Sequence, residues 1–169
     1  TALVYNNPLE AKYRKANGVE RTVTLHPYTL ATFRQGLYLF ALDVDSQLVK
    51  TYALERFVAV ARRRGHHFLM PPDWDPKKHL QHAFGIITGD AEAVVIAFQE
   101  RVTAYIRERT WHPTQSFRTL PDGRLELTMH VAHTVELMTW IQGFGPDAQI
   151  LAPTSLAQTV GQRLRDAAA

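Results

Sequence analysis

The 169-residue sequence predicts an α+β protein in which a small β-barrel is followed by a separate α+β module. The first half contains short alternating or β-branched segments between turn residues, and no helical periodicity is sustained there. The second half alternates strand-like with helix-like segments. Three prolines within 70–76 separate the halves. We therefore expect a barrel at 1–70, a linker and helix at 71–90, and the α+β module at 91–169.

The barrel half contains five or six expected strands. An Asn17-Gly18 turn follows the first, because these residues tolerate the positive φ angles of a tight hairpin. Pro27 is expected to end the second strand. Residues 37–44 are apolar on both faces, so both faces should be covered. The expected strands are 10–14, 21–25, 28–33, 37–44, 48–53 and 58–62. Such short, closely spaced strands are typical of a barrel of the SH3 or Sm kind.

The α+β module follows a short connecting helix. Asp75 and Pro76 form a helix start, an N-cap followed by proline at the first helical position, and Gly85 ends the helix expected at 77–84. The module then reads strand, helix, two strands, helix and strand, at 91–98, 99–109, 117–120, 124–131, 134–142 and 149–151. A last helix is expected at 154–165. This β-α-β-β-α-β order is typical of a ferredoxin-like arrangement.

Composition and charge exclude several classes of site. The chain has no cysteine, which excludes disulfides, a thiolate nucleophile and cysteine-based zinc sites. No apolar segment is long enough to span a bilayer, so we expect a cytoplasmic protein. Residues 1–75 hold ten basic and seven acidic residues, which accounts for the whole net charge of +3. Such a local excess suits an anion or nucleic acid, although an ordinary solvated surface carries one as well.

No motif of a catalytic or metal site occurs in the sequence. A nucleophile elbow, a phosphate-binding glycine loop and a recognisable Ser/His/Asp set are all missing, so we expect neither an enzyme nor a cofactor. His79 and His82, like His130 and His133, have an i, i+3 spacing that two metal ligands can take. Neither pair has a third ligand at a suitable spacing, and no metal site is expected.

Short motifs follow one another in a fixed order along both halves. The barrel half contains Gly36, Leu37-Tyr38-Leu39 and Leu54-Glu55-Arg56-Phe57. The second half contains Trp74-Asp75, Ala83-Phe84-Gly85, Trp111-His112-Pro113-Thr114-Gln115 and Glu136-Leu137-x-x-Trp140-Ile141. Together they resemble bacterial transcriptional regulators with a WYL domain and its C-terminal extension, over roughly residues 9–165. Leu37 replaces the Trp of that family, and Ala53 replaces an Arg that many members carry.

The resemblance implies an Sm/SH3-like barrel that senses an anionic effector, a nucleotide or single-stranded nucleic acid. Arginine forks bind phosphate, and aromatic rings stack on bases. The implied ligand-binding residues are Tyr13, Arg21, His26, Tyr38 and Arg56, with Arg34 and Lys50 as extensions of the patch. The residues alone leave another interpretation open. Tyr13 and Tyr38 could be barrel core residues, and Arg56 could form a structural ion pair with Glu55 or Asp43.

The resemblance further implies the effector-sensing and dimerising region of a cytoplasmic regulator, active as a homodimer and without membrane contact. Family members place a helix-turn-helix domain before the WYL domain, and that domain contacts duplex DNA. Because the chain begins at Thr1, we expect such a domain upstream. The alternative is a ligand-independent scaffold for dimerisation or for contact with another protein.

Overall fold

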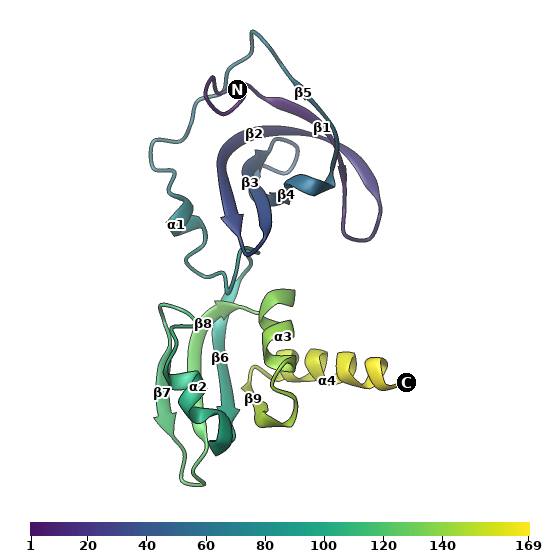
Figure 1. Ribbon diagram of the computed structural model, residues 1–169. Coiled ribbons are helices and arrows are strands. Elements are labelled where there is room, and N and C mark those ends of the chain that lie inside the picture. The colour runs from purple at the N-terminus through teal and green to yellow at the C-terminus, as the bar shows by residue number, and fades with distance from the viewer. The chain divides into compact units, whose positions relative to one another are not determined.

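The computed structural model describes all 169 residues, which form two compact units, Thr1–His79 and Leu80–Ala169. Each unit contains one antiparallel sheet, which confirms the predicted α+β class (Figure 1). The boundary between the units falls inside the segment 71–90, where the sequence predicts a linker. None of the helices combines the length and apolar character needed to cross a bilayer.

Unit 1 is a five-stranded antiparallel sheet with strand order β4-β3-β2-β1-β5. Its strands are β1 (Leu9–Arg14), β2 (Glu20–Phe33), β3 (Gly36–Asp43), β4 (Leu48–Ala53) and β5 (Phe57–Arg62). The edge strands β4 and β5 do not pair with each other, so the sheet is not a closed barrel, and the SH3- or Sm-like barrel expected from the sequence is not confirmed. The 3-10 turn η1 (Leu54–Arg56) leads the chain from β4 to β5, which pairs with β1 at the other edge of the sheet.

Strand β2 is continuous, whereas the sequence predicts two strands that Pro27 separates. Its first half pairs with β1 and its second half with β3, and the register shifts between Pro27 and Thr29. A proline has no N–H to donate, so it is tolerated at a bulge where the ladder is interrupted. Pro27 therefore bends the strand without ending it, and Figure 1 shows β2 curving around β3.

Both faces of this curved sheet are covered. The inner face carries the core residues Ala11, Tyr13, Val23, Leu25, Leu39, Ala41 and Tyr52. On the outer face, the Trp74 indole donates a hydrogen bond to Thr29 Oγ1 at 2.8 Å and packs edge-on against Phe40. Leu39 and Phe40 point to opposite faces and are both buried, as the apolar pattern of 37–44 predicts.

Unit 2 contains a four-stranded antiparallel sheet with strand order β7-β8-β6-β9. Its elements are β6 (Ala91–Phe98), η2 (Glu100–Val102), α2 (Thr103–Arg107), β7 (Ser116–Thr119), β8 (Leu125–Ala132), α3 (Val135–Gln142), η3 (Gly145–Asp147), β9 (Ala148–Ala152) and α4 (Thr154–Ala168). Leaving the short 3-10 turns aside, the element order is the β-α-β-β-α-β expected from the sequence, followed by the last helix.

The connecting helix is much shorter than predicted. Helix α1 spans Pro76–His79, although its start is as expected, with the Lys77 N–H donating to Asp75 Oδ1 at 2.8 Å. The expectation of a helix to residue 84 is wrong because the chain then pairs with unit 2. The His82 carbonyl accepts a hydrogen bond from the Ala132 N–H at the end of β8. This bond replaces the helical pairing that residues 80–84 would otherwise make.

Aromatic residues fill the core of unit 2. Trp111 and Trp140 are in ring contact at 4.8 Å, and Trp140 also contacts Phe84, Phe98 and Phe144. These rings surround buried side chains of β6, β8 and α3, such as those of Val94, Ile96, Leu127 and Leu137. The tryptophans of this unit therefore belong to its core.

Glu136 fixes the segment before β6 onto α3. Its carboxylate accepts hydrogen bonds from the backbone N–H groups of Ile86 and Ile87 at 3.0 and 2.9 Å. A Cβ at Gly85 would lie 2.5 Å from Glu136 Oε1, so a larger residue there would force the Glu136 carboxylate to move.

We expect Gly85→Ala to lower the free energy of unfolding of unit 2 by about 1–3 kcal/mol, because the displaced carboxylate would leave two amides unsatisfied. Urea unfolding at pH 7 measures this. Gly89→Ala is the matched control, since its Cβ would make only an ordinary contact, 3.4 Å from the Ala132 Cβ. Equal losses for both variants would contradict the role of Glu136.

Candidate functional site

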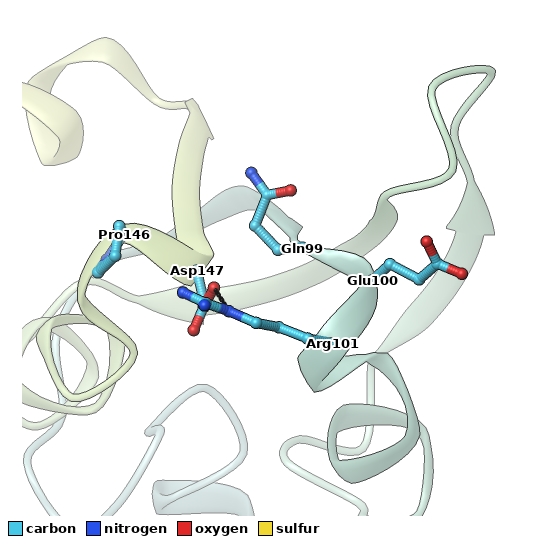
Figure 2. A pocket seen from close by; sticks show the side chains of 5 residues that line it. All are labelled: Gln99, Glu100, Arg101, Pro146 and Asp147. Carbon is cyan, nitrogen blue, oxygen red and sulfur yellow. Dashed lines mark hydrogen bonds and ion pairs between the residues drawn. The ribbon is translucent and has the colours of Figure 1, made fainter.

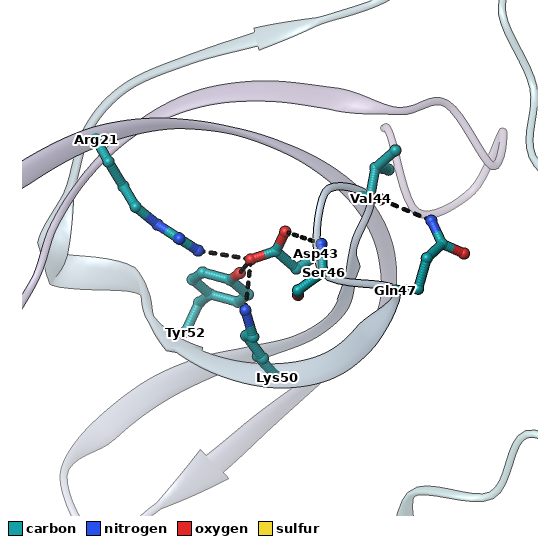
Figure 3. Close-up of polar contacts among 7 residues, drawn as sticks. All are labelled: Arg21, Asp43, Val44, Ser46, Gln47, Lys50 and Tyr52. Carbon is teal, nitrogen blue, oxygen red and sulfur yellow. Dashed lines mark hydrogen bonds and ion pairs between the residues drawn. The ribbon is translucent and has the colours of Figure 1, made fainter.

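A buried carboxylate organises one end of the inner face of unit 1 (Figure 3). Asp43, at the end of β3, is 1% exposed. Its Oδ2 accepts hydrogen bonds from Arg21 at 2.5 Å, from Lys50 at 2.8 Å and from the Tyr52 hydroxyl at 3.0 Å. Its Oδ1 accepts the Ser46 N–H, which closes the β3–β4 turn. One carboxylate therefore binds two cations, and the cluster keeps one positive charge in excess.

The surroundings shift both acidic groups of this cluster. Burial alone would raise the pKa of Asp43. The hydrogen bonds from Lys50, Tyr52, Ser46 and Arg21 outweigh burial and hold this pKa well below its usual range. Burial, and then the hydrogen bond to Asp43, raise the pKa of the Tyr52 hydroxyl far above its ordinary value. Asp43 is thus a permanent anion and Tyr52 a permanent donor near neutral pH.

Two tyrosines connect this cluster to the middle of the inner face. Tyr13 packs edge-on against Tyr52 and against Phe57, each at 5.0 Å between ring centroids. Its hydroxyl accepts a hydrogen bond from the Ala53 N–H across the curved sheet. Tyr13 is 7% exposed. Of the two interpretations that the sequence leaves open, the structure places Tyr13 in the core.

An apolar pocket of about 220 Å³ lies beyond the tyrosines on the same face. It is lined by Thr1, Ala2, Leu3, Leu9, Pro27, Leu30, Leu39, Leu54, Phe57 and Val60. Phe57 belongs to the pocket and also contacts Tyr13, so the pocket and the Asp43 cluster are joined by a continuous series of ring contacts. Sequence reasoning missed this pocket, because its lining comes from four strands, η1 and the N-terminal segment.

Arg56 lies in the chain between two residues that line this pocket, and it forms no ion pair. It belongs to the turn η1, and its chain neighbours Leu54 and Phe57 both line the pocket. Arg56 is exposed, and neither Glu55 nor Asp43 binds it. The alternative of a structural ion pair for Arg56 is therefore not what the structure shows. Asp43 pairs instead with Arg21 and Lys50.

The other predicted site residues lie elsewhere. His26 and Tyr38 point to the outer face, opposite to Arg21 and Leu39 on the same strands. His26 stacks on Phe68 at 4.6 Å, and burial lowers its pKa. Tyr38 covers Gly36, where a Cβ would lie 2.7 Å from the ring. Arg34 is exposed in the β2–β3 turn, at the opposite end of β3 from Asp43.

Unit 2 has a polar surface depression of its own, lined by Gln99, Glu100, Arg101, Pro146 and Asp147 (Figure 2). Arg101 Nε donates to Asp147 Oδ1 at 2.5 Å, and the Gln99 N–H donates to the Asp147 carbonyl. These contacts join the end of β6 to η3, so Arg101 and Asp147 are already paired with each other. No cluster of three or more potential ligands suited to a metal ion is found.

Comparison with known proteins identifies both units. The family model of the WYL domain matches residues 1–62, and that of the WCX domain matches residues 90–168. The chain belongs to the family of WYL-domain regulators with a WCX extension. The WYL match covers the sheet with Asp43 and Arg56, and the WCX match covers the sheet of unit 2.

Several relatives share parts of this WYL–WCX chain. Protein PafC of Mycobacterium tuberculosis is 43% identical over 58 residues, which are 34% of the chain and 17% of PafC. The structure of the proteasome accessory factor PafBC of Arthrobacter aurescens is 19% identical, covers 97% of the chain, and has a TM-score of 0.45. A crystal structure of a CRISPR Cas-related protein covers 98% of the chain at 15% identity with a TM-score of 0.66, so its fold is similar.

The chain spans only a fraction of the length of these relatives, 17% of PafC, 25% of PafBC and 48% of the CRISPR Cas-related protein. The structure also shows the surroundings of Ala53, one position at which the sequence departs from the pattern of the family that it resembles. Ala53, where many members carry an arginine, is buried and donates its N–H to Tyr13. An arginine at this position would have to leave the packing that the small side chain makes here.

We expect Asp43→Asn to lower the free energy of unfolding of the WYL domain by about 1–3 kcal/mol at pH 7. Removing one partner of a buried ion pair costs about 3–5 kcal/mol. This cost is reduced here because Arg21 and Lys50 are 36% and 34% exposed and water screens them.

The pH dependence has a defined sign. The pKa of Asp43 is depressed in the folded state, so its contribution is present above the unfolded pKa of about 4 and is lost as pH falls further. Urea unfolding at pH 7 and pH 3 should therefore show a smaller difference between wild type and Asp43→Asn at pH 3. The control is Asp45→Asn, an exposed aspartate two residues away, which should behave as wild type at both pH values.

Proposed function

We propose that the WYL domain binds an anionic ligand, a nucleotide or single-stranded nucleic acid, at the apolar pocket beside Arg56. The observation that carries this proposal is an exposed arginine without an acidic partner, flanked in the sequence by Leu54 and Phe57, which line the pocket. A guanidinium that no carboxylate neutralises keeps its full capacity to bind phosphate in a bidentate manner.

The dimensions and chemistry of the pocket agree with a base. A cavity of about 150 Å³ already accommodates a benzene ring. The pocket of about 220 Å³ has room for a planar heterocycle of the size of a nucleobase. Its lining offers apolar surface and the ring of Phe57, on which a base can stack. A ligand that combines a planar base with a phosphate therefore matches the pocket and Arg56 together.

The Asp43 cluster supports the same ligand class in a secondary way. Arg21 and Lys50 share one carboxylate, and each keeps about a third of its side chain exposed. The cluster and Arg56 together supply the local positive charge that attracts a polyanion to this face. In this proposal Arg56 contacts a phosphate, while Arg21 and Lys50 contribute mainly to the field.

At the level of the whole protein, we propose an effector-sensing and dimerising region of a transcriptional regulator. The WYL and WCX family matches and the relation to PafC support it. Occupancy of the WYL domain would alter the activity of a DNA-binding domain in the same protein. Such a relay requires that the ligand bind one arrangement of the protein more tightly than the other.

We expect Arg56→Ala to weaken binding of a fluorescein-labelled oligothymidylate about tenfold at low salt, because a charge-assisted phosphate contact is lost. The slope of log affinity against log salt should decrease by about 0.7, the value for one phosphate contact to a single strand. Arg56→Lys should keep this slope while losing part of the affinity. Fluorescence anisotropy over a salt series measures both quantities.

Arg64→Ala is the matched control, since Arg64 is another exposed arginine of unit 1 that forms no ion pair. It should lose much less affinity than Arg56→Ala. Equal effects at both positions would indicate non-specific attraction and contradict a site at Arg56. No binding by the wild-type chain at low salt, together with a stable dimer in light scattering, would favour the ligand-independent scaffold.

A further inference from the structure

Three histidines meet where the chain enters unit 2. His82 lies in the segment before β6, His112 in the loop after α2, and His130 near the end of β8. The rings of His82 and His130 are in edge-to-face contact at 5.4 Å. His112 is 2% exposed and is close enough to both for their charges to affect it. The sequence pairs His79 with His82 and His130 with His133, and it does not indicate this trio.

Hydrogen bonds fix the neutral form of His112. The Thr114 N–H donates to His112 Nδ1 at 3.3 Å, and the Thr114 hydroxyl accepts the His130 N–H at 2.9 Å. With Nδ1 as an acceptor, the ring proton of His112 resides on Nε2. This Nε2 is buried without a hydrogen-bond partner, and so is Nδ1 of His82. Two imidazole nitrogens are thus held out of water, and the Gln81 backbone is the one group near His112 that favours its protonated form.

The electrostatic surroundings oppose protonation. Burial lowers the pKa of His112 below its ordinary value, the Gln81 backbone partly counteracts this, and His82 and His130 lower it further. These two imidazoles are the titratable groups that face His112, one from the segment before β6 and one from β8. The loop of His112 contributes only the neutral Thr114. The carboxylate of Glu92, near this end of β8, is bound by His133 at 3.1 Å.

We propose that His82, His112 and His130 form a proton-sensitive contact, which holds residues 80–83 onto the end of β8 near neutral pH and releases them in mildly acidic solution. The backbone hydrogen bond that depends on this histidine contact is donated by the Ala132 N–H to the His82 carbonyl, at 2.8 Å. Downstream, Phe84 stays packed on Trp140 and the Glu136 carboxylate still binds Ile86 and Ile87. Release is therefore confined to residues 80–83.

Because of the position of this segment, the proton-sensitive contact can change the length of the connection between the two units. Residues 80–83 directly follow the boundary at His79 between unit 1 and unit 2. Their release lengthens the free connection between the two units by four residues. Any coupling that depends on a short connection weakens when the effective concentration of one unit near the other falls. The inference does not depend on ligand binding by the WYL domain.

The sign of the pH effect follows from the folded state. The closed form holds His112 neutral, so opening takes up a proton below the ordinary imidazole pKa of about 6.5. The open population should then increase by about tenfold for each pH unit below 6.5, until the pKa of the closed form is reached.

Amide hydrogen exchange of the full chain at pH 7.5, 6.5 and 5.5, corrected for intrinsic rates, tests this. The Ala132 amide should lose protection by about tenfold per pH unit below 6.5, while the Leu127 amide in the middle of β8 keeps its protection. Unchanged protection of Ala132 would overturn the proposal. A parallel loss at Leu127 would show global acid unfolding and would overturn it as well.

His112→Asn is the decisive variant, because its amide oxygen can still accept the Thr114 N–H but cannot take up a proton in this range. It should remove most of the pH dependence at Ala132, whereas His133→Gln should leave the dependence intact. If His112→Asn does not fold, titration of the wild-type His112 ring by NMR decides. The ring must titrate below the ordinary imidazole range and in step with the exposure of Ala132. Protection that returns on addition of Zn²⁺ at pH 5.5 would indicate a metal site and overturn the proposal.

Discussion

The burial of the Asp43 carboxylate constrains how the strands of unit 1 approach one another. Asp43 needs several donors to remain charged inside the sheet, and no single strand can supply them. Its partners come from β2, β4 and the β3–β4 turn, so these three parts must approach one another around the end of β3. Tyr52 donates to Asp43 and packs on Tyr13, which carries the constraint across the inner face to β1. The curvature of the open sheet is consistent with these contacts.

The Asp43 cluster distinguishes basic residues that have a structural role from those that are free to bind a ligand. Arg21 and Lys50 are committed to a buried anion, and removing either would disturb the packing of the sheet before it disturbed a ligand. Arg56 has no such commitment, because it lies in η1, outside the strands, and forms no ion pair. A charge without an internal partner is the one that a ligand can use without competing with the fold. This difference, and not the number of basic residues, makes Arg56 the best candidate for a direct contact with phosphate.

The sequence predicts the elements of this protein better than their connections. Strand β6 and the turn at Gly123 follow directly from local patterns, since alternation and turn chemistry involve neighbours in the chain. Local rules fail at Pro27, which sits in a bulge between two partner strands, and after His79, where pairing with β8 ends the helix. For the site, residue types suggest Arg21 and Arg56. The face that each side chain takes requires the register, so His26 and Tyr38 could not be excluded from the inner face beforehand.

The histidines of unit 2 show the same limit of prediction from local sequence patterns. Spacing in the sequence pairs residues that a single helix or strand would present together, as at 79/82 and 130/133, where the sequence predicts no metal site. Helix α1 ends at His79, and the His79 ring packs on Phe40 and Trp74 within unit 1. His82 then continues into the other unit and meets His112 and His130, which are distant in the chain. Residues whose spacing suggests a metal pair thus contribute instead to a group of three imidazoles, of which His112 is buried, His82 half-buried and His130 exposed. Burial lowers the pKa of His112, so its neutral form is favoured in the closed state, and the stability of this contact depends on the proton concentration.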